Sequence, residues 1–164
     1  IFSRIAAAHS DYVVAMDADP LVIDRLYNVL KTEKNEKILP LYVDLTDSGG
    51  GVGWRGQERP GIFNRGKPDI VMALAVIHHM AITFHVPLAS QLDMLRDLTP
   101  ELIIEMPHAD DPMVRKLLRN KRDGIHEDFN LDEFERLLNE RFTVKSKMLL
   151  SSGTRTIFHA VRKG

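Results

Sequence analysis

Residues 12–20 read Tyr-Val-Val-Ala-Met-Asp-Ala-Asp-Pro, an apolar run that stops at two aspartates and a proline. A nearly continuous apolar run is typical of a strand buried on both faces of a parallel sheet, so we expect a strand over 12–16. Pro20 suits the first turn of a helix, because the N–H that proline lacks is not needed there. Apolar residues at helical spacing over 21–31 predict that helix. The stretch therefore predicts a buried strand followed by a crossover helix.

The same alternation of strand and helix patterns continues along the chain. Further strands are expected over 38–43, 70–75 and 102–105, and helices over 1–9, 78–98 with a break near 86–87, 112–121 and within 128–142. Segments 143–150 and 155–161 are separated only by Ser-Ser-Gly, which predicts an antiparallel hairpin. The polar, glycine-rich stretch 46–67 is expected to be a long loop. This order predicts an α/β fold with a mostly parallel sheet, helices on both faces and a C-terminal antiparallel hairpin.

Two helix starts carry recognisable capping residues. Asp110 or Asp111 precedes Pro112 and can cap the helix over 112–121. Asn130 is the expected cap of the next helix, with Glu133 three residues on as its capping-box partner.

Composition narrows the class of protein. The chain has 164 residues, enough for one domain with a single core. Its formal net charge of −1 gives no sign of a nucleic-acid or anionic membrane partner. The absence of cysteine excludes disulfides, thiolate metal sites and a cysteine nucleophile, and it fits a cytoplasmic protein. No apolar run reaches the roughly 18 residues that a membrane span requires.

Two aspartates stand where ligands bind in open α/β sheets, just beyond the carboxyl ends of strands. Asp17 follows the first predicted strand and Asp44 follows the second. A carboxylate can accept two hydrogen bonds from a ribose diol, or one from an adenine amine. Each residue also has a purely structural interpretation, because Asp17 can cap a helix and Asp44 can sit in a turn.

These aspartates, together with Ala-Leu-Ala-Val-Ile-His-His-Met at residues 73–80, resemble the class I S-adenosylmethionine-dependent methyltransferases, which have a Rossmann-like fold. The segment 38–47, the Gly53-Trp54 pair and the Leu-Ala-Val-Ile-His-His run resemble, more narrowly, the methyltransferases related to nodulation proteins. The resemblance implies S-adenosylmethionine as cofactor. It gives Asp17 the ribose and Asp44 the adenine. It also places Ala18 and Leu45 beside the base, and Leu74, Ala75 and Val76 along the methionine end.

The beginning of the chain resembles the residues that directly follow the family's glycine motif. Residues 1–6 read Ile-Phe-Ser-Arg-Ile-Ala, and the chain does not open with methionine. The resemblance therefore implies that residues 1–164 are a single methyltransferase domain, N-terminally truncated, without the first strand and glycine-rich loop.

Histidines after the third predicted strand are the candidates for chemistry on the acceptor. His79 can act as a general base on a hydroxyl or amine. His78 and Glu105 are expected beside the acceptor, and Trp54 in the long loop can be an anchor or a lid. Alternatively the histidines, Glu105 and His108 gather around a metal, although no established ligand spacing supports one, or the histidines simply pack.

Two further features have an ordinary and a functional interpretation. The glycine run at 49–51 lacks the Gly-Lys-Ser/Thr ending of a phosphate loop, which favours a flexible substrate loop. The basic cluster 115–122 is expected on a solvated helix face, and Arg155 is expected in a cross-strand pair. For each, contact with an anionic substrate is the alternative.

The function predicted from these residues is methyl transfer from S-adenosylmethionine to a small-molecule acceptor, with nucleic acid not indicated. Two alternatives stay open: a catalytically inactive interaction module on the same fold, and an NAD-type nucleotide-binding oxidoreductase in which Asp17 again holds a ribose.

Overall fold

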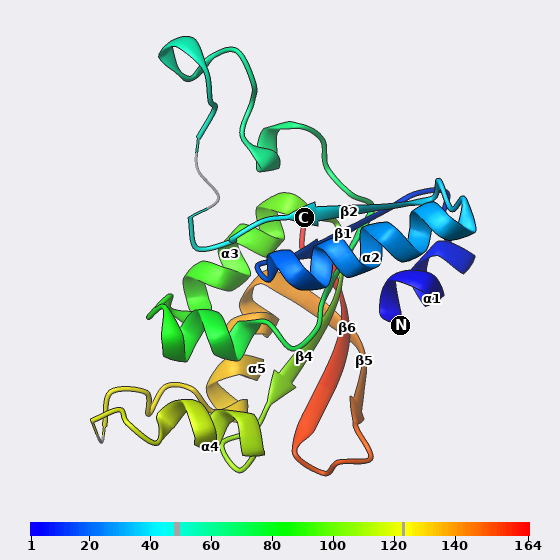
Figure 1. Cartoon of the computed structure of the whole chain (residues 1–164). Helices are drawn as coiled ribbons and strands as arrows, with labels where there is room; N and C mark the ends of the chain where they lie inside the picture. The colour runs from blue at the N-terminus through cyan, green and yellow to red at the C-terminus, as the bar shows by residue number, and fades with distance from the viewer. Residues whose placement is uncertain (48–49, 123) are drawn as a thin grey trace. The chain divides into compact units, whose positions relative to one another are not determined.

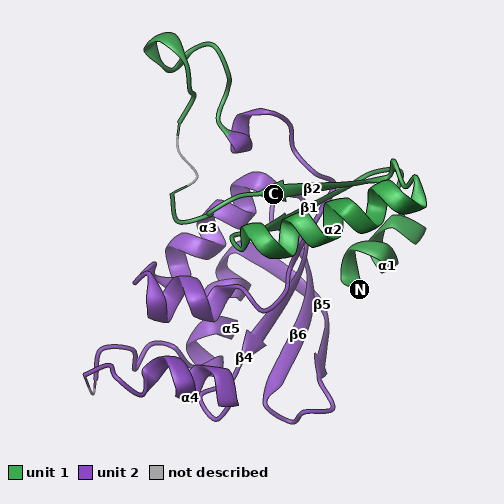
Figure 2. Cartoon of the chain, in the orientation of Figure 1, with its two compact units in different colours: residues 1–61 green, residues 62–164 purple. Residues whose placement is uncertain are grey.

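The computed structural model describes residues 1–47, 50–122 and 124–164 (Figure 1). The chain forms two compact units, Ile1–Gly61 and Ile62–Gly164 (Figure 2). Each unit has its own sheet and its own apolar cluster, so each is described by itself. Gly49 of the predicted glycine run lies outside the described residues.

Unit 1 is a small βαβ layer. Its elements are α1 (Phe2–Ala8), β1 (Val13–Asp17), α2 (Pro20–Glu33), β2 (Ile38–Tyr42) and the 3₁₀ turn η1 (Trp54–Gly56). Strands β1 and β2 pair in parallel, in a register that places Asp17 opposite Tyr42 at the end of the ladder. The crossover predicted from residues 12–31 is therefore confirmed. The prediction that its strand is buried is wrong, because Val14 and Met16 of β1 are 44% and 43% exposed in this two-stranded sheet.

Local chemistry sets both ends of α2. Asp19 is the N-cap, and its side chain accepts hydrogen bonds from the backbone N–H groups of Leu21 and Val22. Pro20 follows as the first helical residue. The helix stops at Lys34, which adopts the left-handed conformation with φ of 53°. The strand, turn and helix around Asp17 are thus specified by adjacent residues.

Unit 2 is built on a four-stranded sheet in the order β3-β4-β6-β5. Its strands are β3 (Ile70–Ala73), β4 (Glu101–Pro107), β5 (Phe142–Leu149) and β6 (Arg155–Arg162), and its helices are η2 (Ile62–Asn64), the π-helical η3 (His79–Thr83), α3 (Leu88–Leu98), α4 (Pro112–Leu118) and α5 (Leu131–Arg141). Strand β3 is parallel to β4, whereas β6 is antiparallel to both β4 and β5. The predicted α/β class and C-terminal hairpin are confirmed.

Strands β4 and β6 supply alternating buried residues to the core of unit 2. Thr156, Phe158 and Ala160 of β6 are buried at alternate positions, and Phe158 packs its ring 5.4 Å from the ring of Phe134 in α5. Leu102, Ile104 and Met106 of β4 are fully buried in the same way. Because side chains alternate across a strand, each of these strands presents one apolar face to the helices.

The capping predictions are confirmed in part. Asp111, and not Asp110, caps α4 by accepting from the Met113 N–H. Asn130 caps α5 by accepting from the backbone N–H of Glu133 at 2.9 Å. The predicted reciprocal half of that capping box is wrong, because the Glu133 carboxylate is bound to Arg136 one turn further along the helix.

Among residues 1–47, 50–122 and 124–164, no helix is both long and apolar enough to cross a membrane.

Candidate functional site

The carboxyl edge of the β1–β2 sheet in unit 1 carries the two predicted aspartates. Asp17 is the last residue of β1, and its carbonyl accepts a hydrogen bond from the Val43 N–H at 3.1 Å. That bond extends the ladder by one residue and brings Asp44 alongside the end of β1. Parallel pairing therefore puts both carboxylates at one edge, as expected from their places after consecutive strands.

Asp17 is exposed and only partly engaged. Its Oδ1 accepts from the backbone N–H of Asp19 at 2.8 Å, which shapes the turn into α2. Within the described residues its second carboxylate oxygen has no hydrogen-bond partner. The helix-cap interpretation of Asp17 is wrong, since Asp19 caps α2. Asp17 thus keeps an oxygen free to accept from a ligand.

Asp44 is half-buried and closes a turn through its side chain. Its Oδ1 accepts from the Thr46 hydroxyl at 2.6 Å and from the Thr46 N–H at 2.8 Å. These hydrogen bonds lower the pKa of Asp44 because they favour the charged carboxylate, and the bond from the Thr46 hydroxyl has the largest effect. Asp44 is therefore an ionised turn residue. Next to the two aspartates stand Ala18, which is exposed, and Leu45, which is half-buried.

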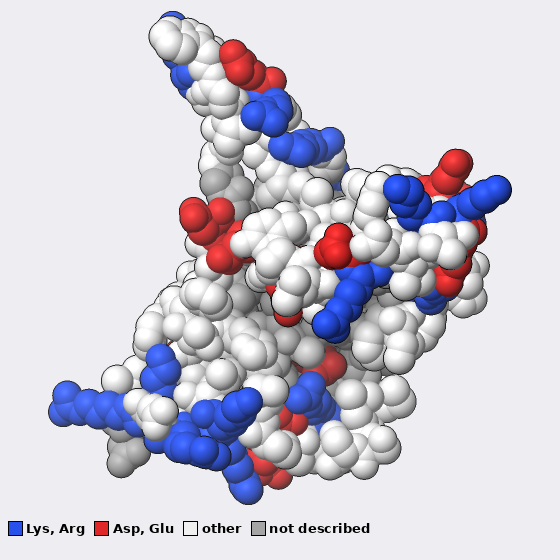
Figure 3. All heavy atoms as spheres, viewed as in Figure 1, with Lys and Arg blue, Asp and Glu red and all other residues white. Residues whose placement is uncertain are grey.

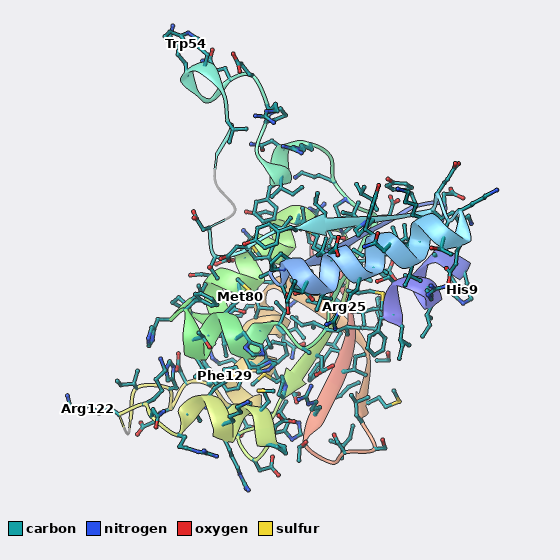
Figure 4. The ribbon with its side chains drawn as sticks, in the orientation of Figure 1. His9, Arg25, Trp54, Met80, Arg122 and Phe129 are labelled. Atoms are coloured by element: carbon teal, nitrogen blue, oxygen red, sulfur yellow. The ribbon has the colours of Figure 1, made fainter. Side chains whose placement is uncertain are left out.

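The long loop of unit 1 contains a tight turn. An antiparallel bridge joins Val52 to Arg59, and Trp54 begins the 3₁₀ turn between them with 78% of its surface exposed (Figure 4). A Cβ on Gly51 would lie 2.0 Å from the carbonyl oxygen of Gly56, so the turn closes only on glycine. The glycines here form a tight turn that presents Trp54 to solvent.

The segment after β3 in unit 2 holds the predicted methionine-end residues. Leu74 and Val76 are half-buried and flank Ala75, which is exposed and has φ of 53°. A left-handed conformation in a residue with a Cβ costs about 1–3 kcal/mol, and such residues cluster at ligand sites. The chain then enters η3, a π-helical turn, which is another feature frequent at functional sites.

His78 and His79 begin that turn with their rings 4.2 Å apart. His78 is 1% exposed, and its Nδ1 is buried without a partner among the described residues. Burial, and then the nearby His79 and Arg155, lower the pKa of His78 to about 4, so this ring is neutral at pH 7. His79 is half-buried and thus better placed than His78 to reach a ligand.

Glu105 is buried in an ion network that the sequence revealed only in part. Arg155 donates from Nη1 to Glu105 Oε1 at 2.7 Å and from Nε to Asp111 Oδ2 at 2.6 Å. Asp111 also accepts from the Thr154 hydroxyl at 3.1 Å. Glu105 and Asp111 are 6% and 1% exposed. The network joins the end of β4, the cap of α4 and the start of β6.

The default expectation for Arg155, a cross-strand pair, is confirmed. In the β4–β6 register Arg155 lies opposite Pro107, two residues from Glu105 on the same face. The sequence did not predict Asp111 as the second ion-pair partner of Arg155, because its position before Pro112 indicates only a helix cap. The charge pattern offers no signal for a pairing between residues 44 positions apart.

The structure does not gather the histidines, Glu105 and His108 into a metal site. His108 Nε2 is bonded to the Thr156 hydroxyl at 2.8 Å, and Glu105 is held by Arg155. Within the part of the chain that the structure describes, no three acidic or histidine side chains are placed to share a metal ion.

Comparison with known proteins gives one sequence relative and several structural ones. Nodulation protein NoeA from Rhizobium meliloti (strain 1021) is 33% identical over 159 residues, which cover 96% of this chain and 33% of NoeA. The chain thus spans about a third of the length of that relative. No protein-family profile matches the chain.

Several solved structures have a similar fold, and two of them serve as examples. The PH0226 protein from Pyrococcus horikoshii OT3 superposes with a TM-score of 0.63 at 15% identity, over 99% of this chain and 76% of that one. A SAM dependent methyltransferase from Aquifex aeolicus gives a TM-score of 0.56 at 13% identity, over 93% of this chain and 69% of that one. The chain therefore has the fold of the class I S-adenosylmethionine-dependent methyltransferases and is a relative of nodulation protein NoeA.

Proposed function

We propose that this chain takes part in methyl transfer from S-adenosylmethionine to a small-molecule acceptor. The observation that carries the proposal is the pair Asp17 and Asp44 at the carboxyl ends of two paired parallel strands, in a chain with this fold. The cofactor supplies a methyl group on a positively charged sulfur, which an acceptor nucleophile can take directly. The protein then chiefly has to bind and orient.

Asp17 and Asp44 have the chemistry that an adenosine requires. The free oxygen of Asp17 suits a ribose hydroxyl donor. Asp44 stays ionised far below neutral pH, and an ionised carboxylate is the stronger acceptor for an exocyclic amine. Ala18 and Leu45, beside them in sequence, would flank the base. Leu74, Ala75 and Val76 would lie along the methionine end.

His79 is the proposed base, acting on a protonated acceptor. When it takes up a proton, neutral His78 adds no positive charge beside it. His78 and Glu105 are buried, so we assign them to the wall of the acceptor site. Trp54 remains a predicted anchor or lid for the acceptor. A cytoplasmic location and a single domain over residues 1–164 also remain predictions.

Calorimetry with S-adenosylhomocysteine, methylthioadenosine and NAD tests the cofactor assignment. Methylthioadenosine shares the adenosine but lacks the amino-acid end, so it measures the part of the site that Asp17 and Asp44 form. We expect Asp17→Ala to weaken binding of both adenosine ligands by about 1–3 kcal/mol, the value of a charge-assisted hydrogen bond. Asp24→Ala is the control, because Asp24 is an exposed aspartate on α2.

Three results would count against the proposal. If NAD binds more tightly than both adenosine ligands, the oxidoreductase alternative is favoured. If even methylthioadenosine, which requires only the adenosine part of the site, does not bind, the inactive interaction module is favoured. If Asp17→Ala and Asp24→Ala bind methylthioadenosine equally well, the ribose assignment of Asp17 is wrong.

A further inference from the structure

Unit 2 contains a pocket of about 230 Å³ between the end of η3 and the segment that leads into α5. Its apolar wall consists of Val86, Pro87, Leu88 and Phe129, of which Phe129 is labelled in Figure 4. Its polar wall consists of His85 and His126. Most small-molecule sites combine an apolar lining with a few polar groups in this way. None of these residues belongs to the proposed methyl-transfer site.

The two histidines of the pocket stack against each other. Their rings stack 5.3 Å apart with an angle of 15° between the planes. His85 adopts a left-handed conformation with φ of 57°, which is unfavourable for a residue with a Cβ. The surrounding structure therefore supplies free energy that holds His85 in this strained conformation beside His126.

Polar groups at the pocket lack a full set of partners. His126 Nε2 is buried, and no described group hydrogen-bonds to it. Lys121 Nζ lies 3.4 Å from His85 Nε2, which leaves further ammonium protons for a ligand. Burial, followed by His85 and Lys121, lowers the pKa of His126, so its ring is neutral at pH 7 and can donate one hydrogen bond. An oxygen acceptor would satisfy both groups.

The charge around the pocket favours an anion, and a monoanion over a dianion. Lysine and arginine side chains gather over α4 and the segment after it (Figure 3), including Arg115, Lys116 and Arg119. Such a field attracts anions. The wall itself includes Asp128, whose carboxylate acts on His126 with the opposite sign to the ammonium of Lys121. Because Asp128 repels negative charge, a monoanionic carboxylate meets less repulsion at this wall than a dianion does.

We propose that this pocket binds a small carboxylic acid. The carboxylate would accept from Lys121 and His126, and the apolar body would pack against Pro87 and Phe129. The inference does not rest on the proposed methyl transfer, because the binding requires no cofactor.

Nuclear magnetic resonance on the full chain, with ¹⁵N-labelled histidine, tests this site directly. The probes are benzoate, neutral benzamide and phenyl phosphate, each at fixed ionic strength. We expect benzoate to shift the imidazole signals of His85 and His126 saturably, and more tightly than either of the other two probes. Lys121→Met should weaken benzoate binding about tenfold, while Lys121→Arg keeps most of it. Lys145→Met, which removes an exposed lysine on β5 outside this basic cluster, should bind as the unaltered chain does.

His126→Phe supplies a second variant, since it keeps a ring in the wall and removes the unpartnered nitrogen. It should also weaken benzoate binding, with the backbone amide spectrum unchanged. The proposal fails if benzoate gives no saturable shift, or if benzamide or phenyl phosphate binds at least as tightly. Equal affinity of Lys121→Met and Lys145→Met for benzoate would also overturn it.

Discussion

Replacing Arg155 with methionine is expected to destabilise unit 2 strongly. Arg155 is bound to Glu105 and Asp111, which are 6% and 1% exposed. Methionine keeps much of the apolar stem but leaves two buried carboxylates without their cation. Breaking a buried ion pair in this way costs about 3–5 kcal/mol. The side chain of Arg155 is itself 25% exposed, so we expect the lower end of that range, about 3 kcal/mol.

Arg136→Met is the matched control. Arg136 also has two carboxylate partners, Glu133 and Glu140, but its side chain is 55% exposed and all three residues lie on α5. Exposed pairs at this helical spacing contribute about 0.3–0.5 kcal/mol each. The two arginines thus make the same number of ion pairs, and burial is the main difference between them.

The dependence on pH separates a lost ion pair from lost packing. Burial alone raises the pKa of Asp111, but hydrogen bonds from Arg155, the Met113 N–H and Thr154 outweigh it and lower the pKa to about 2. A carboxyl whose folded pKa lies below the ordinary 3.8 stabilises the fold above pH 4, here by about 2 kcal/mol, and this contribution is lost as the pH falls from about 4 to 2. In Arg155→Met the unpaired carboxylate is instead relieved by protonation. The stability difference between the two proteins should therefore be largest near pH 7 and shrink below pH 4.

Urea denaturation followed by far-ultraviolet circular dichroism measures these differences. Tryptophan fluorescence would not, because Trp54, the one tryptophan of the chain, is 78% exposed and belongs to unit 1. If Arg155→Met and Arg136→Met lose the same stability at pH 7, the buried network contributes no more than a surface pair. If the loss in Arg155→Met stays constant down to pH 3, it reflects packing rather than charge, and the reasoning is refuted.

Three smaller changes test other features. Asp19→Ala removes the cap of α2 and should cost about 0.5–2 kcal/mol in a thermal denaturation; no loss would mean that the cap is not needed. Asn130→Ala should cost a similar amount at α5, whereas Glu133→Ala should cost only the exposed pair with Arg136, about 0.3–0.5 kcal/mol; equal losses would restore the capping box. In the unaltered chain, stability should fall as the pH drops from about 6.5 to 4, because His78 takes up a proton there only in the unfolded state, and His78→Leu should reduce this fall. An unchanged pH profile from chemical denaturation would contradict the buried, neutral state of His78.

Most of the candidate edge in unit 1 followed from neighbouring residues. The apolar run that ends at Asp17, and the Asp-Pro pair that begins α2, act within a few residues of each other. The Asp44 turn is likewise closed by Thr46, two positions away. Such interactions leave a recognisable sequence pattern, which is why the sequence alone predicts that the two carboxylates lie at one edge of a sheet.

The details of unit 2 could not be predicted in this way. The left-handed backbone at Ala75 and the π-helical turn at η3 have no recognisable sequence signature, because neither glycine nor proline marks them. The stacked pair His85 and His126 joins residues 41 positions apart, and no sequence pattern links them. Each of these features depends on what packs against the segment.

The sequence by itself determined the order of strands and helices, the cap at Asn130, a cap at Asp110 or Asp111, and the two aspartates at strand ends, because these depend on periodicity and on contacts within one turn. Tertiary structure alone decided that β6 runs between β4 and β5, and that Arg155 neutralises both Glu105 and Asp111. The reason is physical: a buried charge needs a partner at a distance set by the packed sheet, and separation along the chain does not fix that distance.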